Sequence, residues 1–189
     1  MTMTRQMLSA FLILALLAAV AVGATTLARM SLDELATAAD VVARVRCLGN
    51  ESKWERGEIW TLTGFEVMET LKGTVPRLIT VRLLGGRVDH LISTVDGAPR
   101  FGPGEEVFLF LERTRDGEFS VTGWVQGTFR IHRDAGTGQE SVTQDSGAAS
   151  VFDPSTRRFR ATAIRKLPVE AFKHRLAEAL ERQQSRRRP

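Results

Sequence analysis

Between residues 41 and 132 the apolar side chains recur in short runs, most of them with a period of two, and turn residues separate one run from the next. In the run 78–84, aliphatic residues at positions 79, 81 and 83 alternate with Thr80 and Arg82. Such alternation is typical of β-strands that bury one face. No helical period separates the runs. A doubly wound α/β fold, which needs a helix between successive strands, is therefore excluded.

These runs predict strands at residues 41–47, 59–71, 78–84, 107–111, 119–124 and 127–132, and a short irregular strand within 87–95. Residues 107–111 are apolar throughout, which predicts a central strand covered on both faces. In the run 59–71 the alternation changes phase at Gly64. A glycine at such a point indicates a β-bulge or a sharp bend, and strands that curl into a small barrel need bends of this kind.

Helical patterns flank this β region. Ser31 and Glu34 have the spacing of a capping box, which predicts a short helix that ends at Asp40. Near the C-terminus, Pro168 is suited to the first turn of a helix, and an apolar stripe follows it at Val169, Phe172, Leu176 and Leu180. The expected fold is mainly β: a small OB-like barrel of six to seven strands, with a short N-terminal helix and a C-terminal amphipathic helix packed on it.

The first 24 residues have the pattern of an export signal. Arg5 precedes an unbroken apolar run from Met7 to Val22, and small residues follow as far as Ala24. We expect cleavage after Ala24 and a secreted or periplasmic protein. The alternative is an uncleaved membrane anchor, because no charged residue occurs between Met7 and Leu27, a length of about 20 residues that is just enough to span a bilayer.

After the signal peptide, 1–24, we expect a β-barrel domain at 25–135, an extended arm at 136–166, the helix at 167–184 and a basic tail at 185–189. Residues 155–189 carry 11 basic and three acidic side chains, whereas the body of the chain is acidic. Three interpretations of the tail arginines Arg186, Arg187 and Arg188 stay open: a solvated tail, weak contact with an anionic lipid or envelope polymer, or folding back on the body. Export argues against nucleic acid as the partner.

Motifs that identify an enzyme are lacking. The sequence contains no phosphate-binding loop, dinucleotide fingerprint, zinc-protease motif or serine-hydrolase motif, and we expect neither a cofactor nor a metal. The three histidines are too far apart in sequence to form a local metal motif. The best acid–base candidates are His90 beside Asp89 and His132 near Asp134. They leave an exported hydrolase as an alternative function.

Other residue types with chemical potential are interpreted structurally. Glu105 and Glu106 adjoin a turn, where neighbours are not held across a cleft as a catalytic carboxylate pair is. Ser146 has no nearby base in its loop. Cys47 is the only cysteine, which excludes an intrachain disulfide and a cysteine-based zinc cluster. It shares a strand face with apolar residues, so we expect a small buried side chain.

Tryptophan supplies the candidate interaction surface. Trp54 lies in a polar segment predicted to be a loop, Trp60 lies near the start of the strand 59–71, and Trp124 ends the strand 119–124. Trp54 and Trp60, if exposed together, form a platform for a sugar or a peptide. The alternative is that Trp60 and Trp124 pack under the loops or under the last helix.

Three stretches carry a family resemblance: AADVV at 38–42, FEVMETLKG at 65–73 and GEEVFLF at 104–110. In the order of these stretches the chain resembles the netrin-like, or tissue-inhibitor-of-metalloproteinase-like, OB barrels of exported bacterial proteins. The resemblance implies a closed barrel with a helix packed against it, and a binding or inhibitory role. The family's inhibitors coordinate the protease metal through an amino-terminal cysteine. Here the mature chain is expected to begin at Thr25, and Cys47 lies in a strand, so that mechanism is not carried over.

Together these patterns predict an exported, non-enzymatic β-barrel domain that binds another protein or a component of the cell envelope. An exported hydrolase with a His/Asp site and a membrane-anchored envelope factor that keeps its N-terminal helix are the two alternatives.

Overall fold

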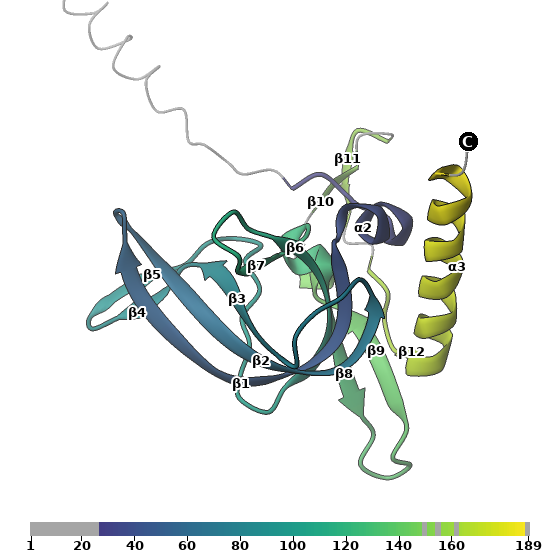
Figure 1. Ribbon diagram of the computed structural model, residues 1–189, viewed down its shortest axis with the longest axis horizontal. Coiled ribbons are helices and arrows are strands. Elements are labelled where there is room, and N and C mark those ends of the chain that lie inside the picture. Colours follow the sequence, from purple (N-terminus) through teal and green to yellow (C-terminus); the bar gives the residue numbers. More distant parts are fainter. Residues whose placement is uncertain (1–26, 149–150, 154–155, 161–162, 188–189) are drawn as a thin grey trace, which may run out of the picture.

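The computed structural model describes residues 27–148, 151–153, 156–160 and 163–187 (Figure 1). The predicted signal peptide, 1–24, and its cleavage site after Ala24 lie outside these residues. The strands are β1 Val41–Glu55, β2 Glu58–Lys72, β3 Leu78–Leu84, β4 Gly86–Val88, β5 Leu91–Ser93, β6 Glu106–Arg113, β7 Phe119–Val121, β8 Thr128–Arg133, β9 Glu140–Gln144, β10 Val151–Asp153, β11 Arg158–Arg160 and β12 Leu167–Pro168. The helices are α2 Leu32–Ala38 and α3 Val169–Arg187, with 3-10 turns η1 Trp124–Gly127 and η2 Asp145–Ala148.

Five strands form a barrel-like ring. Strand β1 pairs with both β2 and β6, so the order β1-β2-β3-β7-β6 returns to β1. The pairings in the ring are antiparallel except for β3 with β7, which run parallel and meet at Val81 and Phe119. Strands β8, β9 and β12 extend the sheet beyond β6. The predicted mainly β barrel is therefore confirmed, with five strands in its ring rather than six to seven. The netrin-like resemblance stays a prediction.

The long β1–β2 ribbon bends at irregularities in its pairing, one of them at the level predicted from Gly64. Cys47 pairs with Phe65 and Gly49 pairs with Gly64, so Leu48 is an extra residue between two successive pairs. The bulge therefore lies on the strand opposite Gly64. A bulge increases the local bend and twist of a ribbon, which helps a short sheet to close.

Two segments contain more strand than expected. Residues 49–55 of the loop predicted at 49–57 continue β1 as far as Glu55. Backbone groups make these pairings with β2, so polar side chains are tolerated there. The extended arm predicted at 136–166 also contains strand β9, which pairs with β8 along a hairpin and then with β12. The hairpin turn is fixed by the Asp134 carboxylate, which accepts hydrogen bonds from the backbone of Gly136 and Thr137.

Two apolar cores lie on opposite faces of β1 and β6. Val41, Ala43 and Val45 of β1 face the barrel interior, whereas Val42 faces outward. In β6 the odd-numbered residues 107, 109 and 111 enter the barrel, and Phe108 and Phe110 join the outer core. This alternation confirms the prediction of a central strand covered on both faces.

Helices α2 and α3 cover the outer core on one side of the barrel, away from the β4–β5 hairpin (Figure 1). The predicted capping box is present, with the Glu34 backbone N–H donating to Ser31 Oγ and the Ser31 N–H donating to the Glu34 carboxylate. Phe172 of α3 packs against Phe108 and Phe129, with ring centroids 5.0 and 4.9 Å apart.

Helix α3 runs from Val169 to Arg187, three residues beyond the predicted end at 184, so the basic tail predicted at 185–189 begins inside the helix. The side chains of Arg186 and Arg187, and the whole of Arg188, lie outside the described part of the chain. No helix within the described ranges combines the length and the apolar character needed to cross a membrane.

Candidate binding site

Trp60 stands on the outer face of β2, which is the face turned away from the barrel interior. Its neighbours in the chain, Ile59 and Thr61, point to the opposite face, because successive residues of a strand alternate. Arg82 of β3 lies on the same outer face, and its guanidinium carbon is 4.2 Å from the centre of the Trp60 ring. This distance is that of a cation–π contact, so the guanidinium lies over the indole ring.

Trp124 reaches the same region from the turn that follows β7, because the strand predicted at 119–124 ends at Val121 and Trp124 begins the 3-10 turn η1 instead. Gly123 and Trp124 both adopt left-handed backbone conformations, with φ of 65° and 58°. A bulky residue seldom adopts this conformation, because its Cβ approaches the backbone too closely. The turn is held in place by the Val125 N–H, which donates to the Gly97 carbonyl at 3.0 Å, and by the Gln126 N–H, which donates to the Gly123 carbonyl.

Trp60 and Trp124 line one small cavity of about 150 Å³. The cavity is mainly apolar, since Leu84, Ala98 and Pro99 complete much of its wall. Both indoles are half-buried, so each one has contacts with the protein and also an open surface. Of the three predicted interaction residues, these two are brought together from separate elements.

Charged groups surround the aromatic pair. The Arg82 guanidinium lies 3.1 Å from the Glu55 carboxylate and 3.8 Å from that of Glu118. Desolvation opposes the ionisation of Glu55, but Arg82 and Lys53 outweigh it, and the pKa of the Glu55 carboxyl is lowered. At neutral pH the edge of the cavity therefore carries a cation held between two carboxylates.

A second, more polar cavity of about 210 Å³ shares Leu83, Leu84 and Pro99 with the aromatic one. It opens on the inner face of the ribbon, where Ser52 and Thr61 hydroxyls are 2.9 Å apart and Thr61 donates to the Gly85 carbonyl. The two cavities lie on either side of the end of β3. Together they hollow this end of the barrel on both faces of the sheet.

Trp54 does not join this site. It pairs across the ribbon with Ile59, while Trp60 pairs with Lys53. Directly paired residues of an antiparallel ribbon share a face, so Trp54 and Trp60 lie on opposite faces. Trp54 is 56% exposed. The condition for a platform of Trp54 and Trp60, exposure together on one face, is therefore not met, because the bulge at Leu48 shifts the face on which every later residue of β1 lies.

The acid–base candidates are not brought together. Asp89 and His90 occupy the turn of the β4–β5 hairpin, whereas His132 and Asp134 lie at the end of the β8–β9 hairpin, and Figure 1 shows these hairpins at different ends of the sheet. The Asp134 carboxylate is used by its own turn, where hydrogen bonds from Thr137 and Gly136 lower its pKa. Among the described residues, no group of three or more histidine, cysteine, aspartate and glutamate side chains could hold a metal ion.

The remaining candidates have structural roles. Glu105 pairs with Arg130 and Glu106 pairs with Arg44 and Arg46, so the two carboxylates are held by different partners. Ser146 is buried. Cys47 is also buried, and the burial raises the pKa of its thiol, which is the opposite of the change that activates a nucleophilic cysteine.

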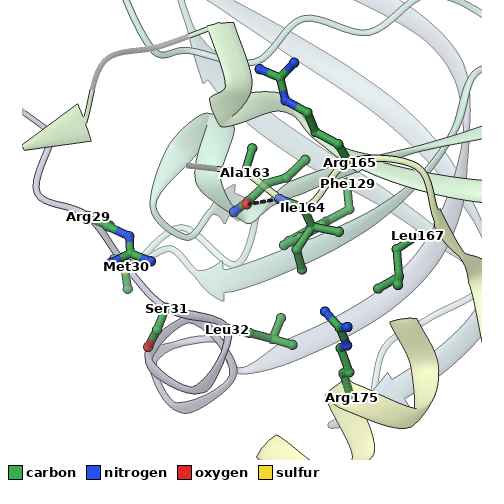
Figure 2. Close-up of a pocket in the computed structure, with 11 residues that line it drawn as sticks. Arg29, Met30, Ser31, Leu32, Phe129, Ala163, Ile164, Arg165, Leu167 and Arg175 are labelled. Carbon is green, nitrogen blue, oxygen red and sulfur yellow. Dashed lines mark hydrogen bonds between the residues drawn. The ribbon is translucent and has the colours of Figure 1, made fainter. Parts of the chain in front are cut away.

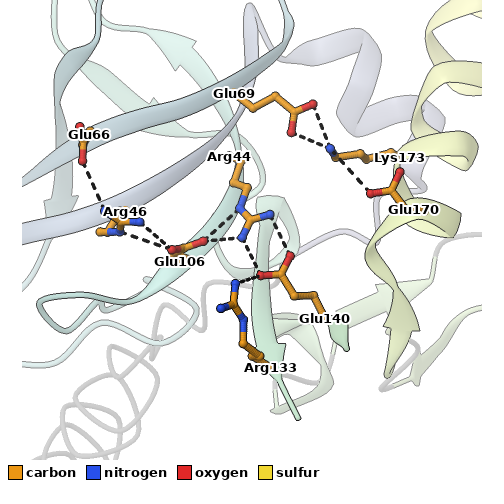
Figure 3. Close-up of polar contacts among 9 residues, drawn as sticks. All are labelled: Arg44, Arg46, Glu66, Glu69, Glu106, Arg133, Glu140, Glu170 and Lys173. Atoms are coloured by element: carbon orange, nitrogen blue, oxygen red, sulfur yellow. Dashed lines mark hydrogen bonds and ion pairs between the residues drawn. The ribbon is translucent and has the colours of Figure 1, made fainter. Parts of the chain in front are cut away.

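A network of arginines and glutamates joins the β8–β9 hairpin to the barrel (Figure 3). Arg44 donates to both Glu106 and Glu140, and Arg133 donates to Glu140 at 2.7 Å. Hydrogen bonds from Arg44, and then from Arg133, lower the pKa of the Glu140 carboxyl to about 2. Each carboxylate of the network is paired with at least two arginines, so we assign it to stability.

Sequence reasoning missed Arg82 and Pro99 as parts of the site. Arg82 has the outward position of an alternating strand, but only the structure places it over Trp60. The signal that would have found it is the paired register of β2 and β3, in which the outer residues Leu62 and Arg82 stand opposite each other.

In the comparisons with known proteins, no family model and no curated protein matched this chain.

Proposed function

We propose that this chain is an exported, non-enzymatic binding domain that holds one apolar side chain of a protein partner in the cavity between Trp60 and Trp124. The observation that carries the proposal is the convergence of these two half-buried indoles, from β2 and from the turn after β7, on one apolar cavity. Exposed aromatic residues that keep an open surface beside a cavity are typical anchors of protein interfaces.

The size of the cavity supports a side chain rather than a whole small molecule as the occupant. A cavity that encloses a drug-sized ligand measures about 300–1,000 Å³, and this one measures about 150 Å³. An aliphatic or proline side chain of an extended segment suits the indole and Pro99 walls. The remainder of the partner then lies across the surface outside the cavity.

The polar groups at the edge of the cavity are paired within the protein, which leaves the apolar wall as the surface that the partner contacts. Arg82 and Ser120 both line the cavity, and the Ser120 hydroxyl donates to Glu112 at 2.8 Å. Arg82 is held by the Glu55 and Glu118 carboxylates, so a partner that covers this edge meets a cation that is already paired. The alternative of a hydrolase draws no support from the described residues, since its His/Asp pairs lie on separate hairpins.

The test is a selection of binding peptides with the exported protein. A library of random extended peptides is displayed and selected against the wild-type protein, and the affinities of the selected peptides are then measured for Trp60→Ala and Trp54→Ala variants. We expect selected peptides to share an apolar residue and to lose about tenfold or more in affinity for Trp60→Ala, because truncation of an interface anchor has effects of this order.

Trp54→Ala is the matched control, since it removes the same side chain from the opposite face of the same ribbon. Its affinities are expected to stay within about twofold of wild type, which is the change typical of residues outside an interface. Equal affinities of the selected peptides for wild type and Trp60→Ala would overturn the proposed site, and so would a selection that yields no binding peptide.

We also propose that residues 1–24 are removed after Ala24 during export, as the small residues at 23 and 24 predict. Sequencing of the amino terminus of the exported protein tests this directly. Thr25 as the first residue supports a free secreted or periplasmic domain. Retention of the apolar segment supports the membrane-anchored alternative instead.

A further inference from the structure

A separate cavity of about 600 Å³ lies where the start of α2 meets the segment 163–167 and helix α3 (Figure 2). It shares no lining residue with the aromatic cavity. Much of its wall is apolar, formed by Leu32 of α2, Phe129 of β8, Ile164 and Leu167. Its volume falls within the range of cavities that enclose small molecules, about 300–1,000 Å³.

Three arginines also line this cavity, and they differ in their surroundings. Figure 2 shows the guanidinium of Arg175 between Leu32 and Leu167, whereas Arg165 extends away from these two side chains. Arg29 lies 3.5 Å from Asp153. Within the described residues, neither Arg165 nor Arg175 makes an ion pair or a side-chain hydrogen bond.

Arg182 lies on the same helix and, unlike Arg175, has a carboxylate partner. Arg182 Nε donates to the Asp33 carboxylate of α2 at 2.8 Å. Arg175, two turns earlier, faces α2 where Ser31 and Glu34 are already used by the capping box. A guanidinium without a carboxylate, placed beside the apolar part of the cavity wall, is suited to the charged end of an anion.

We propose that this cavity binds a single-chain amphiphile, with its anionic head, a carboxylate or a phosphate, on Arg175 and its hydrocarbon chain against Leu32, Phe129 and Ile164. The two parts of the cavity require the two parts of this ligand. An inorganic anion would leave the apolar wall unused, and an uncharged hydrocarbon would cover the Arg175 guanidinium without a hydrogen-bond acceptor, which is costly.

The proposal is tested by calorimetric titration of the exported protein with dodecanoate and with dodecyl phosphate, each below its micelle concentration. Acetate and inorganic phosphate are the controls without a chain, and dodecyltrimethylammonium is the control with the opposite charge. We expect saturable binding of at least one of the two anionic amphiphiles and none of the three controls. The head group that binds more tightly identifies the source of the ligand.

Arg175→Gln and Arg165→Gln form the matched pair of variants. Both remove one exposed guanidinium from the lining of the same cavity, but only that of Arg175 lies between Leu32 and Leu167 in Figure 2. We expect Arg175→Gln to weaken binding about tenfold, the effect of losing a charge-assisted hydrogen bond, and Arg165→Gln to change it by less than about twofold.

Thermal unfolding of both variants shows whether their folds are intact, which is expected because the replaced side chains are exposed. Absence of binding by both amphiphiles would overturn the proposal. Equal weakening by the two variants, or equal binding of the cationic amphiphile, would also overturn it, because either result would mean that the Arg175 charge does not select the ligand.

Discussion

The turn around Trp124 is the place where single residues matter most for the aromatic cavity. Trp124 occupies a left-handed conformation directly after Gly123, and a bulky side chain in that conformation costs on the order of 1–2 kcal/mol. Glycine or asparagine would adopt the same backbone more easily. An aromatic residue kept at a strained position beside a cavity is consistent with a role of its side chain in binding, rather than in the turn.

We predict that Gly127→Ala destabilises the protein by about 1–3 kcal/mol, because overpacking at a position without free space has costs of this size. A Cβ at residue 127 would overlap the Thr122 carbonyl oxygen, and this backbone atom is held because the Thr122 N–H donates to Phe110. Denaturant unfolding measures the change.

Gly64→Ala is the control for this prediction, since a Cβ there meets no atom within 4 Å and the glycine does not have a positive φ. Its stability should stay within about 0.5 kcal/mol of wild type, as expected for an unobstructed surface position. If both substitutions lower the stability by the same amount, the close approach of Gly127 to Thr122 is not the cause of the destabilisation.

At the scale of elements, the sequence predicts those parts that bury apolar side chains at a regular period. Strand β6 and the stripe of α3 are of this kind. The capping box at Ser31 is predictable for another reason, since its two polar residues have a fixed spacing. Strand β9 was beyond such reasoning because it contributes one apolar side chain, Val142, to a core. Its place is fixed by backbone pairing with β8, which leaves little trace in the composition.

In the candidate site, too, some features can be predicted from the sequence and others depend on the fold. Trp60 and Trp124 are identifiable from residue type, but the cavity between them depends on the turn after β7 and on the closure of the ring. The face on which Trp54 lies depends on one extra residue, Leu48, whose bulge has no distinct sequence signal. A shift of one residue moves all later side chains of a strand to the other face, so a local irregularity decides a global arrangement.

Glu140 attaches the β8–β9 hairpin to the barrel through its hydrogen bonds with Arg44 and Arg133. We predict that the protein loses stability in acid, where this carboxylate is protonated. The pKa of Glu140 is about 2 in the folded protein, against 4.5 for a free glutamate. Because its folded-state pKa is lowered, Glu140 stabilises the fold above about pH 4.5, and this contribution is lost as the pH falls toward 2.

We therefore expect Glu140→Gln to be less stable than wild type at pH 7 by about 1 kcal/mol, a value reduced for screening of a partly exposed ion pair. Urea unfolding at pH 7, 4 and 2.5 measures the difference, which should shrink as the pH falls. Glu170→Gln is the control, because that carboxylate is 87% exposed and lies 4.0 Å from Lys173. A constant difference for Glu140→Gln across these pH values would contradict the assignment.

At the scale of the whole molecule, the two cores are separate in space but share the strands β1 and β6. Val41 and Val45 belong to the barrel core, while Val42 between them belongs to the core under the helices. Neither core can lose its packing without exposing one face of these strands. The barrel and the helical layer are therefore expected to unfold in one cooperative transition, as small single domains generally do.

Leu176→Ala tests this coupling. Leu176 is buried and contributes to the outer core only, and its truncation is expected to cost about 2–5 kcal/mol. Unfolding is followed by circular dichroism at 222 nm for α3 and by tryptophan fluorescence for Trp60 and Trp124, which stand beside the barrel. If the cores are coupled, both transitions shift to lower denaturant concentration by the same amount. His174→Ala, on the exposed side of α3, is the control and should leave both midpoints unchanged. A fluorescence transition that stays at its wild-type midpoint while the helical signal is lost earlier would show that the barrel is stable without the helical layer.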